Sequence, residues 1–191
     1  MKSKKTDNAN LIEKLNLRRK YIKEYAPANF TVIDCCAGSG HIWNKLRKEY
    51  PCVYFGIDKK KKNGRLSQDS ARILEAGAIA DVVDIDTYGS PWKHYFNLSK
   101  NIQKNCICFL TIGSTMMGSQ QLEATKFAGI NFTKLSPPIS LVAKFKHLIT
   151  RFAVYYPEKL GIIIKKAEII KHERVEYIAI FMQKDLQSKL K

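Results

Sequence analysis

The sequence predicts an α/β fold in which helices cover both faces of a mostly parallel sheet. Four short apolar runs follow one another from residue 30, namely FTVIDCC, VYFGID, ADVVDID and CICFLTIG. They lack the polar–apolar alternation of a half-exposed strand, and this is typical of strands buried on both faces. The segments between them are long enough for crossover helices, so the runs are expected to pair in parallel.

The first predicted element is a helix that begins near Asn10 and ends before Pro27. Asn10 and Glu13 have the spacing of a reciprocal helix cap. Apolar residues then recur at helical spacing, at Leu11, Leu15, Ile22 and Tyr25. Basic residues stand between them, at Arg18, Arg19, Lys20 and Lys23, either as an ordinary solvated face or as the edge of a polyanion-binding surface. We therefore divide the chain into an N-terminal basic helix, 1–29, and a domain, 30–191.

The later elements follow from the same patterns. A helix is expected from about His41, and a short helical stretch, RILEAG, precedes the third apolar run. Residues 114–160 break the alternation and form an insertion, which we expect to contact substrate. It contains a candidate helix with Leu141, Phe145, Leu148, Phe152 and Tyr156 on one side. Residues 165–184 read as two strands joined by a charged turn at 172–174, an antiparallel hairpin at the sheet edge.

Composition restricts the partners and the compartment. The 191 residues include 33 Lys and Arg against 17 Asp and Glu, a net charge of +16, which favours nucleic acid as a partner over a membrane surface. Lysine kept for solubility is the alternative. The absence of an apolar span of about 18 residues and of a signal peptide predicts a cytoplasmic protein. The five cysteines read as small buried side chains, and the four histidines show no zinc-ligand spacing, so no metal is expected.

The first apolar run leads into a glycine loop, Asp34-Cys-Cys-Ala-Gly-Ser-Gly40, and then into a helix. Such a turn exposes backbone N–H groups and lets a ligand approach the chain closely. Trp43 stands where a nicotinamide-dinucleotide fingerprint needs a third small residue. The loop resembles instead the first motif of the class I S-adenosylmethionine-dependent methyltransferases. The resemblance implies that Ala37, Gly38 and Gly40 hold the methionine end of S-adenosylmethionine, whose ammonium group Asp34 orients.

Two further acids fit a nucleoside cofactor. Asp58 ends the second run 18 residues after Gly40, close to the expected separation of about 20, and its carboxylate can accept both ribose hydroxyls. By the same resemblance Asp69 meets the amine of the adenine. A helix cap on the residues that follow explains Asp69 equally well.

The third run ends in DIDTYGSP, residues 84–91, at the same sheet edge as the glycine loop. It is similar to the Asp-x-Asp-Pro-Tyr/Phe-Gly-Ser-Pro signature of the tRNA guanine-N2 dimethyltransferases, with Thr87 where that family has proline. A carboxylate at Asp86 can accept hydrogen bonds from an exocyclic amine and stabilise the positive charge that develops on its nitrogen. The resemblance implies that Tyr88 stacks on the base, as base-flipping enzymes require.

Basic residues near these motifs are candidate substrate contacts. The run KKKKNGR starts directly after Asp58, and it is either a phosphate-binding strip or a solvated loop. Aromatic residues accompany a basic residue in the candidate helix of the insertion, a pattern that suits unstacked bases. The candidates are Lys60, Lys61, Lys62, Arg65 and Arg151.

The sequence thus predicts an S-adenosylmethionine-dependent methyltransferase that acts on an exocyclic amino nitrogen of a nucleic-acid base. RNA is favoured, with tRNA or rRNA guanine N2 as the target. The first alternative is a DNA adenine-N6 methyltransferase, although residues 114–160 leave little room for a target-recognition region. The second alternative, suggested by Thr87, is a catalytically inactive nucleic-acid-binding protein of the same fold. The oligomeric state is left open.

Overall fold

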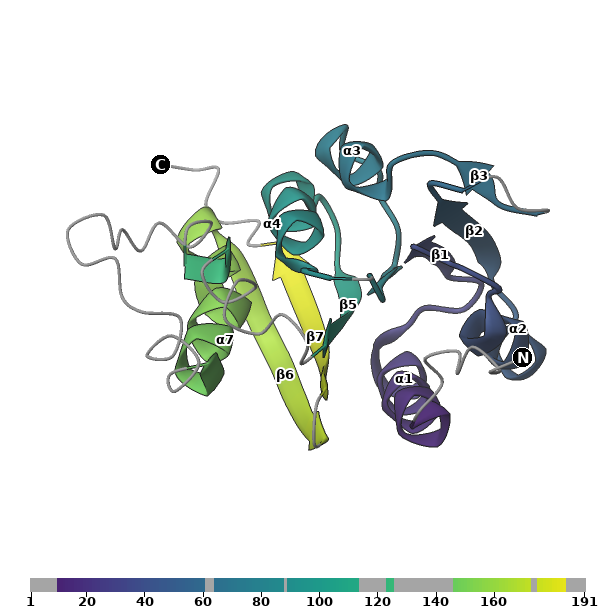
Figure 1. Cartoon of the computed structure of the whole chain (residues 1–191), viewed down its shortest axis with the longest axis horizontal. Helices are drawn as coiled ribbons and strands as arrows, with labels where there is room; N and C mark the ends of the chain where they lie inside the picture. Colours follow the sequence, from purple (N-terminus) through teal and green to yellow (C-terminus); the bar gives the residue numbers. More distant parts are fainter. Residues whose placement is uncertain are drawn as a thin grey trace, which may run out of the picture.

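The protein is built on one seven-stranded sheet. A computed structural model describes residues 10–60, 64–87, 89–113, 123–125, 146–172 and 175–184, and the account below concerns these. The strands are β1 (Thr31–Cys35), β2 (Val53–Asp58), β3 (Leu66–Ser67), β4 (Val82–Ile85), β5 (Cys106–Gly113), β6 (Ile162–His172) and β7 (Val175–Lys184). Their order is β3-β2-β1-β4-β5-β7-β6, with β1 to β5 parallel (Figure 1). The predicted α/β fold with a mostly parallel sheet is confirmed.

Helices cover both faces of the sheet (Figure 1). The helices are α1 (Leu11–Tyr25), α2 (His41–Glu49), α3 (Ser70–Glu75), α4 (Trp92–Asn101) and α7 (Lys146–Tyr155), followed by the 3₁₀ helix η1 (Tyr156–Leu160). The first two lie on one face, and α3, α4 and α7 lie on the other. All of β4 and all but the last residue of β5 are buried, as apolar runs without alternation predict. No described helix is long and apolar enough to cross a lipid bilayer.

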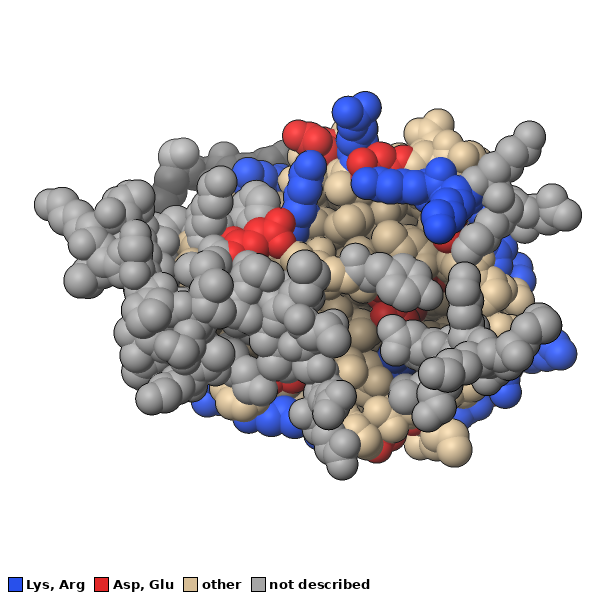
Figure 2. Space-filling view, viewed as in Figure 1, with Lys and Arg blue, Asp and Glu red and all other residues tan. Residues whose placement is uncertain are grey.

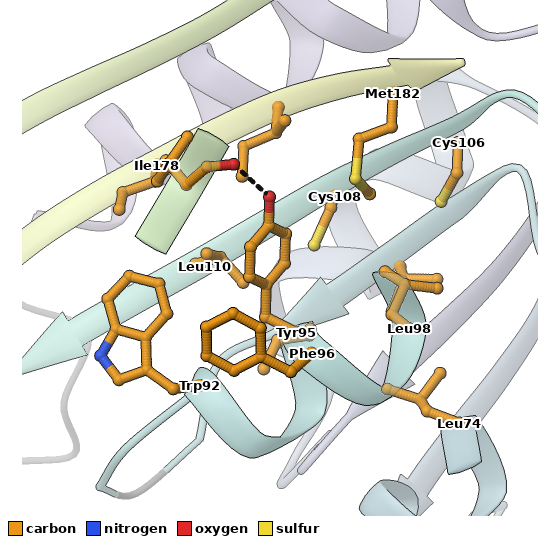
Figure 3. Close-up of a cluster of buried hydrophobic side chains, with 14 of the residues drawn as sticks. Leu74, Trp92, Tyr95, Phe96, Leu98, Cys106, Cys108, Leu110, Ile178 and Met182 are labelled. Atoms are coloured by element: carbon orange, nitrogen blue, oxygen red, sulfur yellow. Dashed lines mark hydrogen bonds between the residues drawn. The ribbon is translucent and has the colours of Figure 1, made fainter. Parts of the chain in front are cut away.

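The core on the α4 face joins the parallel sheet to the later part of the chain. Trp92, Tyr95 and Phe96 of α4 are all buried there, among aliphatic and cysteine side chains of β5 and β7 (Figure 3). The Tyr95 hydroxyl donates a 2.7 Å hydrogen bond to the carbonyl of Val154, which ties α7 to α4. The helix α7 is thereby held over this face of the sheet.

The C-terminal hairpin is confirmed as an antiparallel pair. Strand β7 is antiparallel to both β5 and β6 and lies between them, so only β6 of this pair forms an edge of the sheet. A register shift between Ile164 and Lys166 interrupts the β6–β7 ladder. The predicted turn falls partly on residues 173 and 174, and most of the predicted insertion falls on 114–145; apart from 123–125, these residues lie outside the described part of the chain.

Two details of the predicted helices are wrong. Asn10 has a left-handed backbone, with φ 70°, and its side chain does not cap α1. In α7 the side chains of Leu148 and Phe152 are exposed, and Ile149, Ala153 and Val154 are buried instead. Ala153 and Val154 are small enough for α7 to pack closely on the sheet. Of the apolar stripe that the sequence suggested, Leu148 and Phe152 face outward, whereas Tyr156 packs against the core, and Leu141 and Phe145 lie outside the described residues.

The basic face of α1 is solvated only in part, because Arg18 lies inside the protein whereas Lys20 and Lys23 are exposed. Arg18 is 1% exposed and is paired with an acid inside the protein. Arg19 and Lys20 pair with Glu49 of α2 and Glu168 of β6, respectively. Because α1 contacts β5, β7 and α2, these pairs are part of how it packs on the sheet.

Candidate active site

The glycine loop connects β1 to α2 through a series of left-handed residues. Cys36, Gly38 and Gly40 have φ values of 62°, 53° and 69°, a conformation that favours glycine over residues with a Cβ. The N–H of Gly38 donates to Asp58 at 3.0 Å, and the N–H of Ala37 donates to the carbonyl of Ile57 at 2.8 Å. The end of β2 therefore holds the loop in place, with the Asp58 carboxylate directly against it.

Asp34 ends β1 inside the protein. It is 5% exposed, and the hydroxyl of Tyr54 donates to it at 2.7 Å. Burial, and then the nearby negative charge of Asp84, raise the pKa of the Asp34 carboxyl well above its usual range, against the opposing effect of the Tyr54 hydrogen bond. A positive charge bound beside Asp34 would offset this effect and lower its pKa.

Two carboxylates at the end of β4 are paired with two cations of α1. Arg18 binds Asp84 through Nε at 2.7 Å and Nη2 at 2.6 Å, and both residues are 1% exposed. The indole N–H of Trp43 donates to the same carboxylate at 2.8 Å. Lys14 Nζ lies 2.7 Å from Asp86, whose side chain is 28% exposed. Asp84 is therefore a fully buried anchor, whereas Asp86 keeps part of its surface open.

Sequence reasoning missed Lys14, Arg18 and Tyr54 as parts of this site. A signal for the first two was present in their spacing. Residues four apart on a helix are separated by about 6 Å, and residues two apart on a strand by about 6.6 Å. Lys14 and Arg18 therefore match the spacing of Asp86 and Asp84. This match in spacing predicts the two ion pairs only if α1 is already known to pack over the end of β4.

A pocket of about 130 Å³ opens where these elements meet. The predicted residues that line it are Asp34, Ala37, Gly38, Gly40 and Asp86, and Lys14, Trp43, Asp84 and Thr87 line it with them. Asp58 borders the glycine loop without lining this pocket. Tyr88 lies outside the described residues, so its predicted stacking stays a prediction. Within the described part of the chain, no three His, Cys, Asp or Glu side chains gather to hold a metal ion.

Thr87 follows Asp86 at the position where the resembling signature has proline. Its hydroxyl lies 3.4 Å from the carbonyl of Gly89, a long hydrogen bond that closes the turn after β4. Gly89 has φ 116°, which a residue with a Cβ would rarely adopt. The turn is thus held by a side-chain contact in place of a proline ring.

Asp69 acts as the N-cap of α3. Its carboxylate accepts from the N–H of Ala71 at 3.0 Å, and Lys59 Nζ lies 3.1 Å from its other oxygen. The capping interpretation of Asp69 is therefore seen directly, and its predicted contact with the adenine stays a prediction. Beside it, His94 accepts or donates a 2.9 Å hydrogen bond with the Ser70 hydroxyl, and burial lowers the pKa of His94 to about 4.

The basic candidates do not form one cluster. Lys60 is exposed after β2, where Figure 2 shows Lys and Arg side chains among a few acidic ones, and Lys61 and Lys62 lie outside the described residues. The Arg65 guanidinium stacks over the ring of Tyr54 at 5.2 Å, and a Cβ on Gly56 would lie only 2.4 Å from its Cδ. A Cβ on Gly40 would collide with the Arg65 guanidinium, so this side chain also packs against the glycine loop. Arg151 is exposed on α7, on the opposite face of the sheet.

Comparison with known proteins identifies the fold. No family model matches the chain, and no curated protein matches it. Among solved structures, Trm1 from Pyrococcus horikoshii, in complex with S-adenosyl-L-methionine, matches with a TM-score of 0.62 and 11% identity. The match covers 93% of this chain and 57% of that one, so the chain spans little more than half of its length.

Two further structures match over more of their own length. The plantazolicin methyltransferase BpumL in complex with a pentazolic desmethylPZN analog and SAH has a TM-score of 0.56 at 10% identity, over 94% of this chain and 86% of that one. A hemolysin-like protein from Lactococcus lactis has a TM-score of 0.57 at 15% identity, over 91% and 87%. The chain therefore has the Rossmann-like fold of the class I S-adenosylmethionine-dependent methyltransferases, as the glycine loop and the strand order predict.

Proposed function

We propose that this chain is an S-adenosylmethionine-dependent methyltransferase that acts on an exocyclic amino nitrogen of a nucleic-acid base. One observation carries the proposal: a glycine loop at the end of β1 and a partly exposed carboxylate after β4, Asp86, line the same pocket. In open α/β sheets, ligands bind at this edge. The bound cofactor would supply a methyl group on a positively charged sulfur.

The residues of the pocket fit that cofactor. Its positive ammonium group suits a site with Asp34, which has no paired cation within ion-pair distance among the described residues, in the wall, and the loop of Ala37, Gly38 and Gly40 allows close approach to the backbone. A volume of about 130 Å³ suits the amino-acid end. The ribose would then meet Asp58, which lies against the glycine loop through the N–H of Gly38 and whose carboxylate suits two ribose hydroxyls.

Asp86 is the residue that would act on the target amine. Lys14 contacts one carboxylate oxygen, Oδ2, at 2.7 Å, which orients the group and leaves Oδ1 for the amine. Accepting its hydrogen bonds favours the pyramidal nitrogen that attacks the methyl group, and the negative charge stabilises the cation that forms. Lys14 would thus be a positioning residue for Asp86.

RNA guanine N2, in tRNA or rRNA in the cytoplasm, is the substrate that we favour. The stretch DIDTYGSP resembles the signature of tRNA guanine-N2 dimethyltransferases, and Trm1 is among the proteins with this fold. The charge of +16 suits a polyanionic substrate, whereas a small-molecule or peptide substrate would leave it without a role.

Two measurements test this proposal. Calorimetry should detect binding of S-adenosylmethionine, and radiolabelled cofactor should transfer label to the tRNA or rRNA pool, with N2-methylguanosine found on nucleoside analysis. Asp86→Asn should lower transfer by about a hundredfold or more, while Glu49→Gln, an exposed acid in α2, should leave it unchanged.

The possible results separate the alternatives. Label found in DNA as N6-methyl-2′-deoxyadenosine would show that the substrate is DNA and not RNA. If S-adenosylmethionine does not bind, the proposed methyltransferase activity is wrong. If Asp86→Asn transfers methyl groups as fast as the wild-type chain, Asp86 has no part in the mechanism.

A further inference from the structure

A second pocket lies between α7 and the β6–β7 hairpin. Its volume is about 420 Å³, large enough for a nucleotide. It lies on the α4 face of the sheet, opposite α1. Its floor includes Glu176 of β7, which pairs with Ile112 one residue before the carboxyl end of β5. The pocket therefore lies at the same edge of the sheet as Asp86, on the other side of β5 from β4.

Glu176 is a buried carboxylate that is poorly satisfied by the protein. The residue is 2% exposed. The hydroxyl of Thr150 donates to Oε2 at a long 3.4 Å. Nδ1 of His147 approaches Oε1 to 2.6 Å, but without the geometry of a hydrogen bond, and no other described group donates to that oxygen. A buried acceptor in this state costs free energy, which a ligand that donates hydrogen bonds would recover.

The remaining lining determines what kind of ligand fits. Leu148, Tyr155 and Ile169 provide apolar and aromatic surface, and the first two are 53% and 44% exposed. Arg151 and Lys171 add positive charge to the same pocket. A nucleotide suits this lining, because its planar base can pack against the apolar side chains while its phosphate lies near Arg151 and Lys171. A basic peptide would meet those cations and be repelled.

We propose that this pocket binds a guanine nucleotide of the nucleic-acid substrate, at a position other than the methylated base. The inference rests on the proposed function, because it assumes a nucleic-acid substrate. Guanine presents two adjacent donors, N1–H and the N2 amine, which a single carboxylate can accept together. Uracil instead flanks its one N–H with two carbonyl oxygens, which the Glu176 carboxylate would repel.

The test is binding of free GMP, AMP and UMP to the whole chain, measured by titration calorimetry and NMR chemical shifts. GMP should bind about tenfold more tightly than UMP. Glu176→Gln replaces one acceptor oxygen with a donor and should remove about tenfold of GMP affinity, with little change for UMP. Arg151→Ala, on the exposed side of α7, should weaken all three nucleotides alike. Lys166→Ala, an exposed lysine of β6 outside the pocket, is the matched control.

Each result decides the inference. Equal affinity for GMP and UMP, or GMP binding that neither Glu176→Gln nor Arg151→Ala changes, would overturn it. If Glu176→Gln misfolds, Arg151→Ala still tests whether GMP binds in this pocket. Methyl transfer measured on the same preparations separates the two proposals. A wild-type chain that transfers methyl groups but shows no preference for GMP over UMP would refute this pocket alone, whereas absence of cofactor binding would refute the proposed function itself.

Discussion

Asp34 is a buried carboxylate at the proposed cofactor site. It stands at the end of a strand, 5% exposed, with one hydrogen bond from Tyr54. Desolvation raises its pKa, and the charge of Asp84 adds to this effect. In the unfolded chain the same carboxyl would have a pKa near the ordinary value of 3.8. Folding therefore requires this group to keep a proton that it would otherwise lose.

Asp34→Asn should stabilise the protein and weaken the cofactor site. Between the ordinary pKa and the raised one the native state binds more protons than the unfolded state, so the free energy of unfolding falls as pH rises. The amide removes this cost, and at pH 8 the variant should be more stable by about 1 kcal/mol or more. Urea denaturation from pH 4 to 8 measures the difference, which should shrink toward pH 4.

Cofactor affinity provides the second readout for this residue. Wild-type affinity should increase as pH rises and Asp34 loses its proton, while the Asn variant should bind about tenfold more weakly at pH 8 and show a flatter profile. A variant that is less stable than wild type throughout would contradict the raised pKa.

At the scale of the element, α1 is the helix that completes the site. Its two inward-facing cations neutralise the acids at the end of β4, through the pairs Arg18–Asp84 and Lys14–Asp86. A buried ion pair is weak evidence for stability as such, since both charges lose their water. Its consequence here is orientation, because α1 can dock on the sheet only where both pairs form.

Arg18→Met should be strongly destabilising, since it leaves Asp84 buried with the Trp43 indole as its main donor. We expect a loss of about 3–5 kcal/mol in the free energy of unfolding. Arg19→Met is the matched control in the next position, because its pair with Glu49 is exposed and should contribute little to stability.

A double-mutant cycle with Asp84→Leu, measured by urea denaturation, separates the pair from the rest of the packing. The double variant should lose much less than the sum of the two single variants. Equal effects of Arg18→Met and Arg19→Met would show that the buried pair has no special role.

At the scale of the whole molecule, charge is the property that the fold does not cancel. Several basic residues are used in internal pairs, among them Lys14, Arg18, Lys59 and Lys104. Internal pairing leaves the net charge of +16 unchanged, so the protein still attracts polyanions over distances of about a Debye length, roughly 10 Å at 0.1 M salt. Attraction of this kind is independent of base sequence.

RNA affinity should therefore depend strongly on salt. If the protein neutralises about five phosphates of a single strand, its affinity should fall on the order of a hundredfold between about 50 and 200 mM salt. Fluorescence anisotropy with a labelled RNA measures the slope, and Lys60→Ala should lower it by about 0.7 if that residue contacts a phosphate. Arg19→Ala, which loses a paired charge, is the control. If RNA affinity does not depend on salt, the excess of lysine serves solubility and not RNA binding.

Much of the candidate site could be predicted because its signals are local. Strands buried on both faces appear as apolar runs, and a strand followed by glycines and a helix start indicates a ligand loop. Asp34, Ala37, Gly38, Gly40 and Asp86 were placed in this way, and they line one pocket. Arg65 was not, because its packing against the glycine loop depends on the space that Gly56 leaves on a neighbouring strand.

The sequence by itself determined the parallel sheet, the position of the glycine loop and the acids at the strand ends, since each follows from periodicity or spacing along a short stretch. The tertiary structure decided which charges meet: Arg18 with Asp84 across 66 residues, and Lys14 with Asp86 across 72. It also decided that α7 turns its small residues inward and leaves a pocket above Glu176. Such pairings depend on how helices pack over the sheet, where burial selects among several amphipathic faces that look alike in one dimension.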